Sequence, residues 1–458
     1  MDRVIERIVS MEQTIAYNRL PTNAVQAARR HLVDAIGCAL KGYREPVAEI
    51  ARALASEVTG ARPVSVLGMG RGTTAEMAAF ANGVMIRCLD LNDTYSSSGG
   101  VGHPSDYIPA VLAAGEEAGA PGTVIIEGIV LAYEVFCRLT DATHYGVTGW
   151  DHVCNGVIAS AVASAHVLGL APEEIANAVS LAAISNFALH ETRVGVVSMW
   201  KGAQSANACR NGVFATQLAR RGMTGPEAAF EGRVGIIKVA APQFDLDLLT
   251  TDMDRLAILE CHVKRYPAGF FSQSAIDAAR EIHRRIGHPA RLRSVQLGTF
   301  PFGVQVMAGD REKWAPKTRE SADHSLPYLV AKALQTGDVS FDAFAPEALA
   351  DPDVARILSV LSVVEDPDSA ASWPNEARNV LEVTLDDGTV ERVVVENYLG
   401  HSRNPMPDDM ISEKFLDGAR PLLGDSAADT FLQRLWHVDE LSNIDELMAT
   451  SLVRQPQR

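Results

Sequence analysis

Several motifs that mark well-known enzyme classes are missing from this sequence. It has no His-Glu-x-x-His zinc motif, no Gly-x-Ser-x-Gly nucleophile elbow, no phosphate-binding glycine loop and no dinucleotide fingerprint. The six cysteines are scattered and include no Cys-x-x-Cys pair, which argues against a disulfide framework and against cysteine-ligated zinc or iron–sulfur clusters. We therefore expect a protein that works without a bound metal or cofactor.

Positive charge is also scarce. The 458 residues carry 41 Lys and Arg against 57 Asp and Glu, a formal net charge of −16. A surface this acidic repels nucleic acids and anionic membranes, so we expect neither as a partner. It repels anionic small molecules as well, so a site for one of them needs a local cluster of cations.

The chain shows no pattern of export or of a membrane span. Charged residues are frequent in the first seven positions, where a signal peptide needs an apolar run. Residues 153–172 carry no charge and are long enough to cross a bilayer, but they include Asn155, Ser160 and His166. We expect this segment to form a buried core helix and the protein to be cytoplasmic.

The length predicts two domains. In the first 240 residues apolar side chains recur at helical spacing, as between Val25 and Leu40, where Gly42 is expected to end the helix. Further helical patterns cover about 47–58, 74–88, 105–118, 123–140, 153–169, 173–187 and 203–221. Many positions on their inner faces are Ala, Gly or Ser, which favours closely packed helices.

The pattern changes after about residue 265. Residues 292–300 alternate like a strand, and 381–385 and 390–395 predict a hairpin around Asp387-Gly388. Helices are expected at 271–286, 324–336, 408–416 and 427–435. We therefore predict a mainly α fold, with an all-α domain from residues 1–265 and 400–458 and a smaller α+β domain from 266–399. A ligand cleft is expected between the two.

Candidate chemistry is densest between Asp90 and His103. Asp90 and Asp93 follow an apolar helix, where carboxylates oppose the helix dipole and add no stability. A Ser- and Gly-rich stretch, expected to be a loop, joins them to His103. We interpret Asp90 and His103 as functional; the alternative is that these polar residues only form turns. For Ser105 we expect an N-cap of the helix after Pro104.

Three further clusters supply cations and proton donors. Lys201 stands at the start of an Ala-rich helix, where the ammonium and the helix dipole both attract a carboxylate; a solvated surface lysine is the alternative. Lys264 and Arg265 are adjacent at the predicted domain junction and fit a carboxylate clamp. His152 begins the uncharged helix and Tyr328 opens another, although each also fits an ordinary core residue.

Taken together, these clusters resemble the MmgE/PrpD family, which includes 2-methylcitrate dehydratase, cis-aconitate decarboxylase and an iminodisuccinate epimerase. The matching segments are 89–94, 102–106, 149–153, 198–201, 264–268 and 322–328. The resemblance implies a large all-α domain with a smaller α+β lid, usually as a homodimer. It implies site residues that match Asp90, Thr94, His103, Lys201, Lys264 and Tyr328.

Two differences from the decarboxylase branch of the family narrow the expected reaction. The decarboxylase branch carries a histidine at the position of Gly269, and glycine cannot transfer a proton. That branch also has its other histidine at or one residue before His152, where Asp151 stands. Both differences favour the dehydratase branch.

We predict a hydro-lyase that dehydrates a small β-hydroxy polycarboxylate such as 2-methylcitrate. His103 is the expected general base, because a histidine near its ordinary pKa is poised at neutral pH. Lys201 and Lys264 stabilise the aci-carboxylate that forms when the proton leaves. Asp90, alone or with His152 or Tyr328, is expected to orient His103 or to protonate the leaving hydroxyl. The residues expected to bind the substrate are Thr94, Asp93, Lys264 and Arg265. The alternatives are a decarboxylase, an epimerase or a catalytically silent binding or scaffold protein.

Overall fold

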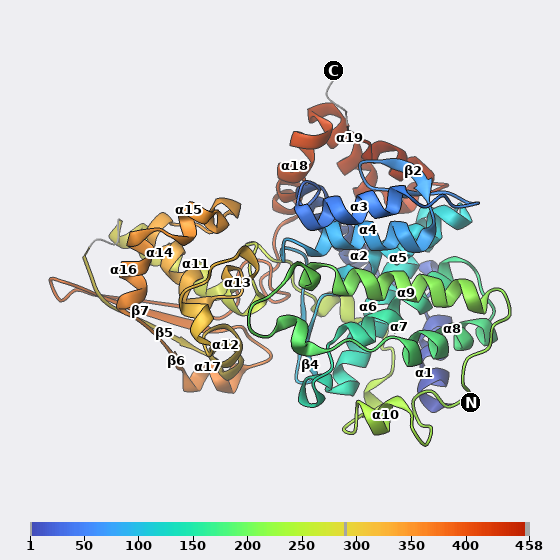
Figure 1. Ribbon diagram of the computed structural model, residues 1–458, viewed down its shortest axis with the longest axis horizontal. Helices are drawn as coiled ribbons and strands as arrows, with labels where there is room; N and C mark the ends of the chain where they lie inside the picture. The colour runs from blue at the N-terminus through green and yellow to red at the C-terminus, as the bar shows by residue number, and fades with distance from the viewer. Residues whose placement is uncertain (1, 288–290, 454–458) are drawn as a thin grey trace. The chain divides into compact units, whose positions relative to one another are not determined.

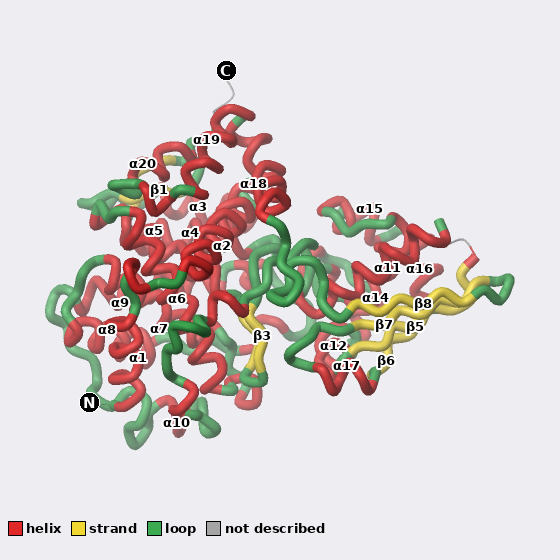
Figure 2. Tube along the Cα trace, turned by 180° about the vertical axis from the view of Figure 1, so that it is seen from behind, coloured by secondary structure: helices red, strands yellow, loops and turns green. Residues whose placement is uncertain are grey.

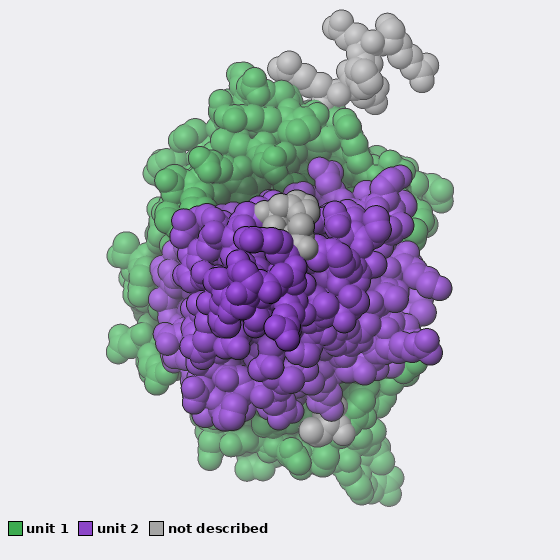
Figure 3. Space-filling view, turned by 90° about the vertical axis from the view of Figure 1, so that its left-hand side faces the viewer, with its two compact units in different colours: residues 1–192, 199–263, 406–458 green, residues 193–198, 264–405 purple. Residues whose placement is uncertain are grey.

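The protein forms two compact units, which Figure 3 colours separately. The computed structural model describes residues 2–287 and 291–453. Unit 1 comprises residues 1–192, 199–263 and 406–458, and unit 2 comprises 193–198 and 264–405. The two units thus divide after residues 263 and 405, where the sequence predicts domain boundaries after 265 and 399. The domain bounds drawn from the sequence stay a prediction.

Unit 1 is a stack of helices (Figure 1). Its helices are α1 (Arg3–Thr14), α2 (Thr22–Lys41), α3 (Pro46–Ser56), α4 (Ala75–Arg87), α5 (Ile108–Ala118), α6 (Gly122–Thr143), α7 (Val153–Val167), α8 (Pro172–Ser185), α9 (Gln204–Ala219), α10 (Ile236–Val239), α18 (Asp408–Leu423), α19 (Asp425–Trp436) and α20 (Asp445–Met448). The helices expected in this region are confirmed, including the end of α2 at Gly42.

The apolar helix α7 packs against α6, α8 and α9, which confirms the predicted core helix. Within residues 2–287 and 291–453, no helix is long and apolar enough to cross a membrane.

Small residues bring α4, α7 and α9 into close contact. A Cβ added at Gly83 of α4 would lie 2.9 Å from the Ala206 Cβ of α9, and one at Gly212 would lie 2.5 Å from the Ser160 Cβ of α7. Because α4 and α9 pack side by side, the residues that follow α4 reach those that precede α9. This approach brings Asp90 and Lys201 together.

Two short hairpins accompany the helices of unit 1. One pairs β1 (Val64–Val66) with β2 (Gly70–Thr73), and the other pairs β3 (Tyr95–Ser97) with β4 (Gly100–Gly102). The second hairpin corrects the loop expected over residues 96–102. Its serines and glycines have low strand propensity, but the Tyr95 hydroxyl bonds Asp141 of α6 at 2.9 Å and holds the strand against that helix.

Unit 2 contains a four-stranded sheet in the order β6-β5-β7-β8 (Figure 2). The strands are β5 (Leu292–Thr299), β6 (Leu361–Glu365), β7 (Asn379–Leu385) and β8 (Val390–Val395). The predicted strand and hairpin are confirmed, and Gly388 adopts the left-handed φ of 87° that the turn requires. β6 is missing from the sequence prediction. It pairs with β5 in parallel, through a distant contact that no local pattern marks.

Helices accompany the sheet of unit 2. They are α11 (Gln273–Ile286), α12 (Pro301–Met307), α13 (Arg319–Ala322), α14 (Leu326–Thr336), α15 (Pro346–Leu349), α16 (Pro352–Ser359) and α17 (Pro367–Ser372). α11 packs on β7 and β8 and against α14. The described chain as a whole is mainly helical, as expected; the action of unit 2 as a lid stays a prediction.

Candidate active site

The first element of the site is a tight turn after α4. Asp90 has a φ of 51°, a left-handed conformation that L-residues other than glycine rarely adopt and that clusters at functional sites. Its N–H donates to the Arg87 carbonyl at 3.1 Å, and the Arg87 guanidinium donates to the Asp90 carboxylate. Both side chains are buried. The turn therefore folds the carboxylate back over the end of α4.

Lys201 approaches the same carboxylate from the short 3₁₀ helix Met199–Gly202 that precedes α9. Its Nζ lies 3.7 Å from Asp90 Oδ2, and the side chain is buried, so the surface-lysine alternative is wrong. Gly202 makes the approach possible, because a Cβ there would lie 3.1 Å from the Cys88 Cα.

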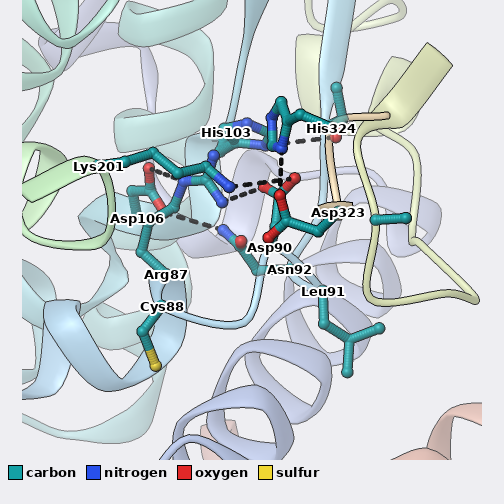
Figure 4. A network of polar contacts seen from close by, with 12 residues as sticks. Arg87, Cys88, Asp90, Leu91, Asn92, His103, Asp106, Lys201, Asp323 and His324 are labelled. Atoms are coloured by element: carbon teal, nitrogen blue, oxygen red, sulfur yellow. Dashed lines mark hydrogen bonds and ion pairs between the residues drawn. The ribbon is translucent and has the colours of Figure 1, made fainter. Parts of the chain in front are cut away.

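A second buried carboxylate, Asp106, balances the two cations (Figure 4). Arg87 Nε lies 3.7 Å from Asp106 Oδ2, and Asn92 Nδ2 donates to Asp106 Oδ1 at 2.8 Å. Arg87 and Lys201 thus face Asp90 and Asp106. This balance lets four ionisable groups share one buried cluster.

His103 is oriented by the main chain. Its Nδ1 lies 2.7 Å from the Asp93 carbonyl, with Thr94 Oγ1 at 3.3 Å. A carbonyl only accepts, so Nδ1 carries the hydrogen and the neutral ring has its lone pair on Nε2. That tautomer suits a general base that uses Nε2.

The Asp93 carboxylate holds in place the segment whose main-chain carbonyl orients His103. It lies 3.1 Å from His31 Nδ1 and accepts hydrogen bonds from the Tyr133 hydroxyl at 2.6 Å and the Ser105 N–H at 3.1 Å. Burial raises the pKa of Asp93, but the hydrogen bonds and charge of His31, with the bonds from Ser105 and Tyr133, bring it below its usual value. Asp93 is therefore an ionised side chain that holds the segment, and its carbonyl holds His103.

The expected N-cap at Ser105 is wrong. The helix after His103 is a 3₁₀ turn, Pro104–Tyr107, without a side-chain cap of its own. The Ser105 hydroxyl accepts from Asn92 Nδ2 at 2.9 Å, and the distant Asp93 accepts the Ser105 N–H. A partner twelve residues away replaces the local cap, so capping statistics could not find it.

His152 lies beside His103 at the start of α7. The two ring centroids are 5.7 Å apart, and His152 Nδ1 lies 3.1 Å from Asp151 Oδ1. Gly102 allows this contact, because a Cβ there would lie 2.4 Å from Phe136 Cζ and 3.0 Å from His152 Cδ2. Two imidazoles, one of them beside a carboxylate, thus lie next to each other within unit 1.

The other predicted residues belong to unit 2. Lys264 is its first residue after the junction, and His262, two positions earlier in unit 1, exchanges backbone hydrogen bonds of 2.8 and 2.7 Å with Thr94. The Arg265 N–H donates to Gln273 Oε1 at 3.2 Å. Tyr328 lies in α14, where its hydroxyl donates to the Ala343 carbonyl and burial raises its pKa.

Several residues of the cluster are absent from the sequence prediction. They are Arg87, Asn92, Asp106, His31 and Tyr133. Arg87 offered a signal, as a lone cation near the end of an otherwise apolar helix. The others act through partners far away in the sequence, which spacing alone does not mark.

Comparison with known proteins identifies the family. Residues 6–249 match the MmgE/PrpD N-terminal domain and residues 266–438 match the MmgE/PrpD C-terminal domain, so the chain belongs to the MmgE/PrpD family.

Three similar proteins come from two bacteria and a fungus. The chain is 28% identical to a 2-methylcitrate dehydratase of Cupriavidus necator over 412 residues, which cover 83% of this chain and 82% of that protein. It is 26% identical to the 2-methylcitrate dehydratase of Escherichia coli O157:H7, with coverages of 88% and 86%. It is also 26% identical to the cis-aconitate decarboxylase-like protein oryM of Aspergillus oryzae, with coverages of 94% and 93%. These relatives indicate a lyase of the dehydratase type.

Proposed function

We propose that the protein is a hydro-lyase that removes water from a small β-hydroxy polycarboxylate of the 2-methylcitrate type, without a metal. The observation that carries this proposal is the pair of imidazoles 5.7 Å apart, one with its tautomer fixed by the Asp93 carbonyl and the other beside Asp151. Elimination of water needs a base at one carbon and an acid at the next. Two such groups side by side provide both.

In the proposed reaction His103 Nε2 removes the proton from the carbon next to a carboxylate. The electrons of the C–H bond move into that carboxylate, which becomes an aci-carboxylate with extra negative charge. The Lys201 ammonium stabilises this charge, because a cation already held in place by Asp90 needs no reorganisation as the charge develops. Arg87 holds Asp90 in turn.

The hydroxyl on the neighbouring carbon then leaves as water. His152 supplies the proton, because the Asp151 carboxylate stabilises its imidazolium form. The C–O bond breaks and the carbon–carbon double bond forms. The proton taken by His103 then returns to solvent, and His152 takes up a proton from solvent in its place. Acid–base catalysis of this kind contributes roughly 10²–10⁴-fold, and electrostatic stabilisation supplies a further share.

The remaining predicted residues take supporting roles. We assign substrate binding to Thr94, Lys264 and Arg265, and a proton-donating role to Tyr328. Asp93 keeps a positioning role, because its carboxylate is buried among His31, Tyr133 and Ser105. Unit 2, which carries Lys264, Arg265 and Tyr328, acts as the lid.

We also propose that two copies of the chain associate. Large apolar side chains are exposed in unit 1 along residues 184–214, at Ile184, Leu189, Met199, Trp200 and Phe214. These side chains fall within one stretch of the chain, and an interface with a second copy would remove them from water.

A decarboxylase is the second candidate, because the relative from Aspergillus oryzae matches 94% of this chain. Gly269 opposes it. A Cβ at this position would lie 3.0 Å from Met307 Cε and 3.2 Å from Met307 Sδ, so a histidine fits only if Met307 moves. The proposal therefore stays with dehydration.

Incubation of the purified protein with 2-methylcitrate, citrate, cis-aconitate and related diacids tests the proposal. Ultraviolet absorbance of an unsaturated product supports dehydration. Released CO₂ or exchange of deuterium without a new double bond supports a decarboxylase or an epimerase instead. Failure to convert any of these acids favours a binding or scaffold protein, and stoichiometric iron or zinc in the purified protein contradicts the metal-free reaction.

A further inference from the structure

A lysine of the C-terminal helix α18 contacts the segment that carries Asp90. The Lys414 ammonium donates to the Leu91 carbonyl at 3.0 Å and to Asp34 Oδ1 at 2.5 Å. The Lys414 side chain is 11% exposed and that of Asp34 is 1% exposed, so the bonds lie in the interior of unit 1. Leu91 follows Asp90 directly and precedes Asp93 by two residues. Lys414 therefore holds the main chain in the middle of the site segment.

Helix α2 holds the same segment. His31 lies 3.1 Å from the Asp93 carboxylate, and Asp34, one turn further along, is the ion-pair partner of Lys414 and does not itself hold the segment. α2 and α18 come close because Gly37 leaves no room for a side chain, since a Cβ there would lie 2.9 Å from the Phe415 Cα. Two ionisable side chains, His31 of α2 and Lys414 of α18, thus contact residues 91–93.

The ion pair of Lys414 with Asp34 and its hydrogen bond to the Leu91 carbonyl contribute differently. Burial lowers the pKa of Lys414, but Asp34, together with Cys38 and Asp93, raises it above its usual value, so the ammonium stays charged. Burial, together with the charge of Asp93, raises the pKa of Asp34 above its usual value, although Lys414 lowers it. Removing both charges together is expected to be tolerated better than removing one of them, because a single remaining charge would be buried without its partner. The bond to Leu91 then remains as the reason for a lysine at this position.

We propose that Lys414 is a positioning residue of the reaction: by holding the Leu91 carbonyl, it fixes residues 90–93 and, through the Asp93 carbonyl, the orientation of His103. This inference rests on the proposed function, in which His103 is the base. It assigns to the C-terminal segment a role in the site that residues 1–263 do not supply alone.

A double-mutant cycle tests the proposal with Lys414→Met, Asp34→Asn and the double variant. Lys414→Met leaves Asp34 buried and unpaired, so its Tm falls, whereas the double variant recovers most of the Tm. The kcat, unlike the Tm, is expected to depend on the hydrogen bond from Lys414 to the Leu91 carbonyl. We expect kcat to fall about 10- to 100-fold in both variants that lack Lys414, with KM within about threefold of wild type. Asp34→Asn keeps the bond, and its kcat stays within about threefold.

Asp417→Asn is the matched control. Asp417 lies on α18 like Lys414, but it is exposed and pairs with Lys41 of α2. A double variant with wild-type kcat and a recovered Tm overturns the proposal, as does an Asp34→Asn variant that is as slow as Lys414→Met.

Hydrogen exchange separates this inference from the proposed function. The Thr94 N–H bonds the His262 carbonyl at 2.8 Å, so loosening of residues 90–94 is expected to speed its exchange in both variants that lack Lys414. Unchanged exchange in these variants contradicts the positioning role. If the wild type converts none of the acids but the exchange accelerates, the proposed function fails while the positioning of the segment stands.

Discussion

Gly102 offers the sharpest perturbation of the site. The Cβ of a Gly102→Ala variant would lie 2.4 Å from Phe136 Cζ, where ordinary contact begins at 3.4 Å. β4 must therefore retreat from α6 by roughly 1 Å, and His103 moves with it. Overpacking of this kind costs about 1–3 kcal/mol. A misplacement of 1 Å lowers turnover about 10²-fold, or about 2.7 kcal/mol, so we expect kcat to fall at this scale even though the variant stays folded.

Steady-state kinetics and thermal unfolding of three variants check this expectation. Gly72→Ala in β2 is the control, because a Cβ at Gly72 meets nothing within 4 Å. The double variant Gly102→Ala/Phe136→Leu removes the clashing Cζ, and we expect it to recover at least about tenfold of the lost turnover. A Gly102→Ala variant with wild-type kcat and Tm would refute the argument that the close approach sets the positions of His103 and His152.

Two further predictions concern stability and assembly. Burial lowers the pKa of His166, but hydrogen bonds to Glu12 at 2.8 Å and Glu127 at 3.2 Å outweigh it and raise the pKa to about 9. The stability from this charge is complete below about pH 6.5 and is lost as the pH rises through about 9, so the Tm of wild type falls more steeply over this window than that of His166→Gln; equal slopes contradict the assignment. Phe214→Glu is expected to convert a dimer into a monomer in light scattering, and a wild type that is monomeric contradicts the proposed association.

The helices of unit 1 could be predicted because their signals are local. Val25 to Leu40 carry a helical apolar repeat that Gly42 ends. In unit 2 the Asp387-Gly388 turn likewise predicts the hairpin of β7 and β8. β6 could not be predicted in this way, because its pairing with β5 bridges more than sixty residues.

The residues of the site could likewise be predicted where their signal is local, and could not where it depends on distant contacts. Asp90, His103 and Lys201 stand out as polar residues in apolar surroundings, which a sequence displays directly. The group that orients His103 is a main-chain carbonyl, which no residue type marks. Asp93 is predicted from its position to bind substrate, and its contacts with His31 and Tyr133 could not be predicted, because those residues approach from distant helices. Sequence therefore predicts which residues are chemically unusual, and only packing reveals which of them hold the others in place.

The most direct test of the central claim is the turnover of His103→Ala on the acid that the wild type converts. The account predicts a loss of at least about 10²-fold with an unchanged Tm, and a loss of similar size for Lys201→Ala. Turnover near the wild-type rate in His103→Ala would contradict the assignment of this histidine as the base.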